Sequence, residues 1–253
     1  MSLGRTLLLV AAGVGGGLTG SVAGLASLVS YPVLLALGLP PVSANVTNTV
    51  ALMAGSVGSV SASRPELGGR RAELRPLLIA GLLGGTVGGA VLLLAPDGSF
   101  ERLVPVLIFA ASVAILLPRP KALISVGASP KGPARPSRWT LAAVALVGAY
   151  GGYFGAGAGV MMLALLLRAT HDSVPRCNAV KNLVLGLANA IAASAFVIFG
   201  PVRWNVVVPL GLGLFVGGRL GPAIVRRVPT RPLRLAIATA GFGLAVRLAV
   251  TSW

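Results

Sequence analysis

The sequence predicts an all-α polytopic membrane protein with about eight transmembrane segments, arranged as two homologous, inverted four-helix repeats. Three observations lead to this prediction. The mean hydropathy is +0.91, and only 10% of the residues are charged, against roughly 25% in an average soluble domain. Glycine is abundant, with 35 residues, which suits close contact between helices in lipid. Glycines and prolines also recur in constant register along the chain.

The recurrence divides the chain into two repeats. A shift of 133 residues aligns Asn45 with Asn178, Pro76 with Pro209, and Gly84, Gly85 and Gly88 with Gly217, Gly218 and Gly221. A shift of 135 residues aligns Gly13, Gly16, Gly17, Gly20 and Gly24 with Gly148, Gly151, Gly152, Gly155 and Gly159. We therefore expect a first repeat over 1–117, a basic Pro-rich linker over 118–138 and a second repeat over 139–253. The repeat also argues that the amino-terminal apolar run belongs to the fold rather than to a cleaved signal peptide.

Each repeat contains four apolar segments. They cover 6–37, 44–63, 74–95 and 102–117 in the first repeat, and 139–167, 177–199, 204–225 and 232–250 in the second. A helix that spans a bilayer needs about 20 residues, so the first segment of each repeat is too long for one simple span. Each is interrupted by a glycine run, "GGGLTGSVAG" or "GGYFGAGAG". These runs predict a broken helix or a re-entrant turn, covered by protein or lining a cavity.

The charges favour a place in the cytoplasmic membrane. Lys and Arg total 21 against 5 Asp and Glu, and nearly all lie between apolar runs, where they can meet anionic membrane lipids; we expect no nucleic-acid partner. The linker 118–138 should be cytoplasmic. Eight simple spans with an internal amino terminus would leave the Arg-rich segments 168–176 and 226–234 outside. Broken first segments that turn back would invert the second repeat and bring these charges inside.

Two polar stretches follow the glycine runs, "LGLPPVSANVTNTV" at 37–50 and "RCNAVKNLVLGLAN" at 176–189. With the glycine clusters and the basic central loop, they resemble the sulfite exporter TauE/SafE family, also called the toluene sulfonate uptake permease family, over nearly the whole chain. The resemblance implies a multi-span carrier of small sulfur-containing anions, such as sulfite, thiosulfate, sulfoacetate or taurine-related sulfonates, and sometimes carboxylates. In the second repeat "THDSVP" replaces "LGLPP" and Val180-Lys181 replaces Thr47-Asn48. We therefore expect a site whose chemistry is not symmetric.

The polar stretches also predict an anion site from chemistry. An anion that leaves water needs donors and positive potential, which amides, hydroxyls, half-helix N–H groups and one lysine can supply. The candidate substrate-binding residues are Asn45, Thr47, Asn48, Thr49, Asn178, Lys181, Asn182 and Asn189. The candidate path or helix-break residues are Gly16, Gly17, Gly20, Pro40, Pro41, Gly152, Gly155 and Gly157.

Each candidate also has a structural interpretation. Asn45 and Thr47 can be helix caps, Lys181 can mark the membrane interface, and Asn189 can bond a neighbouring helix. The glycines can serve close helix packing alone. For Arg219 we favour the interface over anion attraction, and for His171 a surface position over a proton relay.

The acidic residues limit the function classes. All five, Glu66, Glu73, Asp97, Glu101 and Asp172, lie in connections, which disfavours cation transport. We find no catalytic set and no group for a metal or cofactor, and Cys177 is the lone cysteine. The sequence thus predicts a secondary transporter, not an enzyme, that exports a small sulfur-containing anion by alternating access. The alternatives are a passive anion channel, an uptake permease for a related sulfonate or carboxylate, and a non-transporting membrane partner. The sequence leaves open whether the protein forms a homodimer.

Overall fold

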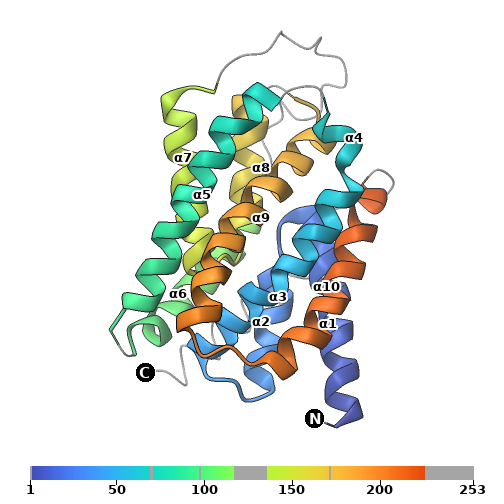
Figure 1. The fold of residues 1–253 in the computed structure, drawn as a ribbon, viewed down its shortest axis with the longest axis vertical. Helices are drawn as coiled ribbons and strands as arrows, with labels where there is room; N and C mark the ends of the chain where they lie inside the picture. The colour runs from blue at the N-terminus through green and yellow to red at the C-terminus, as the bar shows by residue number, and fades with distance from the viewer. Residues whose placement is uncertain (1, 69–70, 97, 117–135, 171, 226–253) are drawn as a thin grey trace.

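The computed structural model describes residues 2–68, 71–96, 98–116, 136–170 and 172–225, and every regular element in these ranges is an α-helix (Figure 1). Four of the described helices are long and apolar enough to cross a membrane: Leu3–Ala23, Ala72–Leu94, Val174–Phe199 and Trp204–Ala223. Several features of the sequence lie outside the described residues: the eighth apolar segment 232–250, the Arg-rich segment 226–234, His171, Asp97 and most of the linker 118–138.

Ten helices follow one another in the described ranges. In the first half they are α1 (Leu3–Ala23), α2 (Ala26–Ala36), α3 (Pro41–Ala62), α4 (Arg64–Leu67), α5 (Arg71–Leu94) and α6 (Ser99–Leu116). In the second half they are α7 (Arg138–Tyr153), α8 (Ala158–Ala169), α9 (Val174–Phe199) and α10 (Trp204–Val225). Both long first segments are therefore split in two, as the glycine runs predict.

The first break lies between α1 and α2. Gly24 adopts a left-handed conformation with φ 76°, and its N–H caps α1 by bonding the carbonyls of Gly20 and Thr19. Glycine adopts this conformation without the steric cost that a Cβ brings. The chain then turns back, because Gly16 lies against Ala26 and Ser30 of α2. α1 and α2 form a hairpin.

The second break lies between α7 and α8. After Tyr153 the chain passes through Gly155 and Gly157, both with φ 76°. The Tyr150 hydroxyl donates a hydrogen bond of 2.7 Å to the Ala156 carbonyl and so holds this turn. α8 also turns back beside α7, since a Cβ on Gly151 would meet the Ala158 Cβ at 3.9 Å. α7 and α8 form the second hairpin.

The long helices pack as two groups of three parallel helices, and each group combines both halves of the chain. α10 lies beside α1 and α3: a Cβ on Gly17 would overlap the backbone of Leu214, and one on Gly58 would overlap Phe215. α5 lies beside α7 and α9: a Cβ on Gly84 would overlap the Ala145 carbonyl, and one on Gly85 would overlap Ala188. These approaches explain the high glycine content, because larger residues would force the helices apart.

Basic residues from both halves gather at one end of the molecule. Arg176 donates a hydrogen bond of 2.9 Å to the Glu66 carbonyl, and Arg219 donates one of 3.1 Å to Ser61 Oγ. We call this the basic end; it also holds Arg64 and Arg168. The amino terminus lies at the opposite end (Figure 1). The amino terminus and Arg64 lie at opposite ends because α1 and α2 form a hairpin before α3; one unbroken span over 6–37 followed by a second over 44–63 would bring them to the same end.

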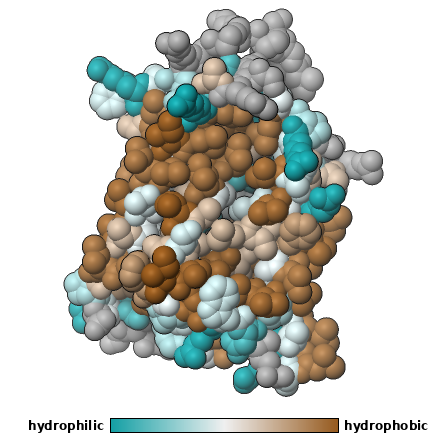
Figure 2. Space-filling view, viewed as in Figure 1, coloured by the Kyte–Doolittle hydropathy of each residue, from teal (hydrophilic) through white to brown (hydrophobic). Residues whose placement is uncertain are grey.

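An apolar surface separates the two ends. Figure 2 shows apolar side chains over much of the middle of one face, with hydrophilic residues gathered toward both ends. Exposed apolar residues of the long helices include Leu83, Val87, Leu146, Leu212 and Leu220, each at least 50% exposed. An apolar surface of this kind is suited to lipid rather than to water. Arg219 is exposed at the basic end, in keeping with the interface interpretation.

Candidate functional site

The tips of the two hairpins touch in the interior. A Cβ on Gly24 would overlap the backbone of Gly159, and a Cβ on Gly159 would overlap Gly24. These two glycines occupy corresponding positions in the aligned halves, 135 residues apart. The contact therefore joins equivalent points of the two breaks, and only residues without a side chain can make it.

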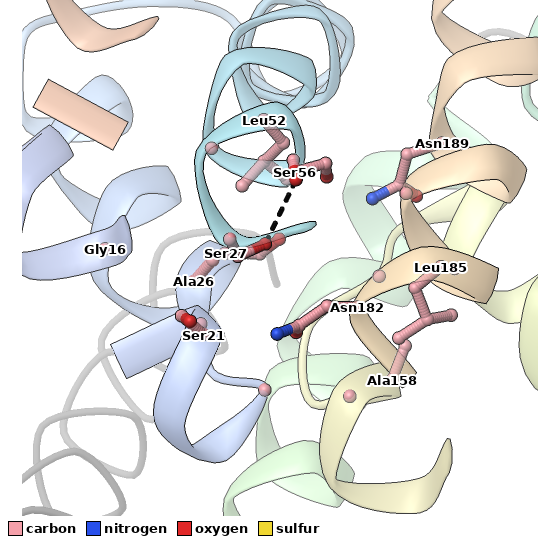
Figure 3. A pocket seen from close by; sticks show the side chains of 18 of the residues that line it. Gly16, Ser21, Ala26, Ser27, Leu52, Ser56, Ala158, Asn182, Leu185 and Asn189 are labelled. Carbon is pink, nitrogen blue, oxygen red and sulfur yellow. Dashed lines mark hydrogen bonds between the residues drawn. The ribbon is translucent and has the colours of Figure 1, made fainter. Parts of the chain in front are cut away.

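A cavity of about 90 Å³ opens beside this contact, between the hairpins and the helices α3 and α9. This volume can hold a few water molecules or one small solute. Its polar lining residues are Ser21, Ser27, Thr49, Ser56, Ser59, Lys181, Asn182 and Asn189. Figure 3 shows Asn182 and Asn189 projecting from α9 toward the side where Ser21, Ser27 and Ser56 lie. No carboxylate lines the cavity among the described residues, so its chemistry is that of donors and one cation.

Lys181 is buried at the edge of this cavity, with 1% of its surface exposed. Its ammonium donates hydrogen bonds to the carbonyls of Gly20 at 3.0 Å and Ser21 at 3.3 Å. Both carbonyls belong to the last turn of α1, the end at which the helix dipole favours a cation. Lys181 therefore lies inside the protein and not at the membrane interface, the alternative left open by the sequence.

Asn178 and Asn45 hold the breaks of the opposite halves. Asn178 Nδ2 donates a hydrogen bond of 2.8 Å to the Ser21 carbonyl in α1. Asn45 Nδ2 donates one of 2.8 Å to the Tyr153 carbonyl at the end of α7. Carbonyls at a helix end lack intrahelical partners, and each asparagine supplies one. Neither lines the cavity.

Thr47 and Asn48 also make structural bonds away from the cavity. Thr47 Oγ1 accepts a hydrogen bond of 3.0 Å from the Arg203 backbone N–H, which joins α3 to the start of α10. Asn48 Oδ1 accepts one of 2.6 Å from Ser30 Oγ. Pro40 is the N-cap residue of α3 and makes no side-chain cap bond. The cap interpretation of Asn45 and Thr47 is thus replaced by bonds to other segments.

Two polar atoms in the cavity wall lack partners among the described residues. They are Ser21 Oγ and Asn182 Nδ2, and their residues are 4% and 8% exposed. In Figure 3 the Asn182 amide points across the cavity toward Ser21. Buried polar groups are nearly always hydrogen-bonded to protein, water or ligand. The Asn182 amide points into the cavity and is therefore prepared to bind a polar solute there, whereas Ser21 Oγ lies beside Gly221, where an added Cβ would meet it at 2.6 Å.

The other candidates divide between the cavity and its frame. Thr49, Asn189, Gly16, Gly17, Gly20 and Gly155 line the cavity. The Thr49 hydroxyl already donates to the Asn45 carbonyl at 2.9 Å. Gly152 instead packs against Gly85 of α5, Gly157 is the N-cap residue of α8, and Pro41 is the first residue of α3. These three residues shape the helices around the cavity.

Sequence reasoning missed four serines: Ser21, Ser27, Ser56 and Ser59. A signal existed for two of them. Thr49, Leu52, Ser56 and Ser59 follow each other at spacings of three and four residues, which places them on one face of α3. The same spacing joins Asn182, Leu185 and Asn189 on α9. Ser21 and Ser27 lie in and after the glycine run, where the sequence offers no comparable period.

Comparison with known proteins gives a consistent result. The model of a protein family described as "Sulfite exporter TauE/SafE" matches residues 9–248. A "Probable membrane transporter protein ORF9" of Sinorhizobium sp is 28% identical over 234 residues, covering 92% of this chain and 87% of that protein. A "Probable membrane transporter protein" of Haemophilus influenzae is 26% identical over 215 residues, covering 81% of this chain and 79% of that protein. No solved structure matches the chain. The resemblance drawn from the sequence is confirmed.

Proposed function

Because this chain belongs to the sulfite exporter TauE/SafE family of multi-pass membrane transporters, which are not enzymes, we propose that it is a secondary transporter for a small sulfur-containing anion. The substrate classes that we propose are sulfite, thiosulfate or a small organosulfonate. The proposed direction is export across the cytoplasmic membrane by alternating access. With the inside negative, the membrane potential favours anion exit by about 2.3 kcal/mol per charge per 100 mV.

The observation that carries this proposal is the donor-rich cavity. Ser21, Asn182 and Asn189 offer hydroxyl and amide groups, and Lys181 brings a positive charge to the same wall. An anion that gives up its water shell needs such groups, because an unpaired charge in a low-dielectric interior is strongly unfavourable. The small volume of about 90 Å³ favours a compact oxyanion over a bulky aromatic sulfonate.

The paired lining of the cavity supports alternating access by two inverted repeats, which we propose to be residues 1–117 and 139–253 joined by the linker 118–138. Thr49, Leu52 and Ser56 correspond to Asn182, Leu185 and Asn189 at the shift of 133, and all six line the cavity. Gly16, Gly20 and Gly24 correspond to Gly151, Gly155 and Gly159 at the shift of 135, and all six line it too. Two like modules around one site can exchange conformations and so expose it to either side in turn.

The proposal is tested with flux in proteoliposomes. Sulfite, thiosulfate and small sulfonates are offered under an imposed voltage, with wild type beside Lys181→Ala. We expect Lys181→Ala to lower anion flux at least about tenfold, equivalent to about 1.4 kcal/mol, while the protein still inserts and purifies as a folded species. Arg219→Ala is the matched control, since it removes an exposed cation outside the cavity. Equal flux in wild type and Lys181→Ala would contradict the role of the cavity.

The same vesicles separate the alternatives. A carrier saturates and supports counterflow of labelled substrate, whereas a channel shows neither at comparable concentration. An uptake permease would move substrate inward against the voltage. A non-transporting partner would show no flux with any anion of the panel.

A further inference from the structure

A groove of about 420 Å³ lies between the helices α5 and α9. The two helices run side by side (Figure 1) and approach closely, since a Cβ on Gly85 would overlap Ala188. We call this surface feature the α5–α9 groove. Its volume is within the range of pockets that hold small organic ligands, about 300–1,000 Å³. The groove is lined by Leu74, Arg75, Leu78, Ile79, Leu82 and Leu187.

The α5–α9 groove has a charged end and an apolar body. On α5 its residues Arg75, Leu78, Ile79 and Leu82 follow each other at spacings of three and four, which places them on one face of the helix. α5 begins just after α4, at the basic end of the molecule (Figure 1). Arg75 therefore lies at the side of the groove nearer the basic end, and Leu82 lies about 10 Å further along the helix axis.

The body of the groove is suited to a lipid chain. The chain belongs to a family of multi-pass membrane transporters, and the helix face beside the groove is apolar and exposed, with Ile79 at 50% and Leu83 at 58%. Water in such a groove finds too few polar partners to be stable. A flexible acyl chain can follow the groove and supply the van der Waals contacts that its walls would otherwise lack.

The charged end is suited to an anionic headgroup. Arg75 is exposed, and no hydrogen bond or ion pair joins its guanidinium to another described residue. Glu73 is two residues away on α5, and residues at this spacing do not face each other on a helix. The guanidinium fork matches the geometry of a phosphate. The positive-inside rule places the basic end at the cytoplasmic leaflet, which carries the anionic lipids.

The second half of the chain lacks this combination. At the shift of 133, Val208 of α10 corresponds to Arg75 and is 60% exposed. Gly211 corresponds to Leu78, and a Cβ there would meet the Ala54 Cβ of α3 at 3.6 Å. α10 also begins at the end of the molecule opposite to the basic end (Figure 1). The cation thus belongs to the one of the two related helices that begins at the basic end.

We propose that the α5–α9 groove binds an anionic phospholipid, with one acyl chain in the groove and the phosphate on Arg75. The bound lipid would lie on the side of α9 away from the cavity, because Leu185 and Asn189 line the cavity while Leu187 between them lines the groove. It would hold from outside the helix that carries Lys181. Lipid binding needs no transported solute, so this inference goes beyond the proposed function.

The first test measures headgroup preference in the full chain, purified and delipidated in neutral detergent. Dioleoyl phosphatidylglycerol and dioleoyl phosphatidylcholine are the probes, because they share both chains and differ in net charge. Native mass spectrometry reads the first bound lipid, and thermal unfolding reads the stabilisation that binding brings. We expect wild type to bind phosphatidylglycerol about fivefold more tightly, the preference that one arginine near the surface gives.

The variant Arg75→Gln should lose this preference and bind both lipids alike. Arg219→Gln is the matched control, because it also removes one exposed arginine at the basic end but lies on α10, outside the groove. Its preference should stay within about twofold of wild type. Phosphatidylglycerol preference that persists in Arg75→Gln, or an equal loss in Arg219→Gln, would overturn the inference.

A second pair of variants tests the chain and does not depend on charge. Leu187→Trp adds a ring inside the groove and should weaken the binding of both lipids several-fold. Leu212→Trp adds the same ring at an exposed position of α10, outside the groove, and should bind both lipids as wild type does. Unchanged lipid binding in Leu187→Trp would overturn the inference. Glycerol 3-phosphate, which has the phosphate without the chains, should not stabilise the protein; stabilisation equal to that by phosphatidylglycerol would also overturn it.

The same spectra separate the other occupants of the groove. A dimer that retains no lipid would mean that a second copy covers the groove. A monomer that binds no lipid would mean that another part of the chain covers it. Either result would overturn the inference. The proposed transport would be unaffected, because anion flux in proteoliposomes tests it independently.

Discussion

At the end of α1 the Ser21 carbonyl accepts a hydrogen bond from Asn178, and at the end of α7 the Tyr153 carbonyl accepts one from Asn45. Asn45 and Asn178 are corresponding residues of the two aligned halves, and the two bonds have the same length, 2.8 Å. Each half thus closes the break of the other with the same side chain. The bonds that build the frame of the site are shared by both halves.

Three residues further along, the two halves differ. Lys181 places its ammonium on the carbonyls of Gly20 and Ser21, whereas the corresponding Asn48 accepts a bond from Ser30 inside its own half. The break of α1 therefore receives a positive charge and the break of α7 does not. The comparison shows that two halves with equivalent hydrogen bonds at their helix breaks can still place a positive charge at only one of the breaks. Such a site offers an anion one electrostatically preferred wall.

The largest effect should come from the contact that both breaks share. Gly159→Ala adds a Cβ that would overlap the Gly24 backbone, so we expect loss of the folded protein. Gly38→Ala is the control: Gly38 has φ 87°, but a Cβ there meets nothing within 4 Å. Gly38→Ala should lower the free energy of unfolding by only about 1–2 kcal/mol, the cost of placing a residue with a Cβ in the left-handed conformation. Size-exclusion profiles and thermal unfolding in detergent give the comparison, and a stable, monodisperse Gly159→Ala protein would contradict it.

The next effect concerns the asymmetry itself. Lys181→Asn gives the second half the residue of the first and removes the cation from the cavity wall. We expect anion flux to fall about tenfold or more, since about 1.4 kcal/mol of substrate attraction corresponds to that factor. The matched change at the corresponding position of the first half is Asn48→Ala. It removes no charge, and Asn48 lies outside the cavity. Flux through this variant should therefore stay within about twofold of wild type, which corresponds to less than about 0.5 kcal/mol. Equal losses in the two variants would mean that the charge is not what separates the halves.

A smaller and symmetric effect is expected from the frame. Asn45→Ala and Asn178→Ala each remove one amide that bonds a carbonyl at a helix break. Side-chain hydrogen bonds inside membrane proteins contribute about 0.6 kcal/mol on average and up to about 1.7, so each variant should lower the free energy of unfolding by about 1 kcal/mol. Unfolding titrations in mixed detergent measure both. A difference larger than this value between the variants would show that the two frames are not equivalent.

The sequence was sufficient for the features that depend on neighbours along the chain. Glycine runs weaken helices wherever they occur, so both breaks were predicted at their places. Asn182 and Asn189 were predicted as substrate-binding candidates, and both line the cavity. Lys181 was predicted as a candidate cation, although its place inside the protein was left open, because a lysine stem can reach either an interface or an interior.

The features that depend on contact between the halves could not be predicted. Asn45 was a candidate for substrate binding, but its partner is the Tyr153 carbonyl, 108 residues away. Ser21 gave no signal, since a serine among glycines is typical of any close helix contact. In each case the deciding neighbour comes from another segment.

The smallest effects separate the cavity from its frame with two serines of the first half. Ser21 Oγ is buried without a partner among the described residues, so Ser21→Ala removes a polar atom that the fold does not satisfy, and stability should stay the same or rise by up to about 1 kcal/mol. Ser21 lines the cavity, so flux should still fall a few-fold. Ser30→Ala instead removes a 2.6 Å bond to Asn48 outside the cavity, and should lower stability by about 1 kcal/mol with flux unchanged. Flux and the free energy of unfolding are measured on the same preparations of both variants. The direction of each change matters more than its size, because a purely structural role for Ser21 would make stability and flux fall together in Ser21→Ala.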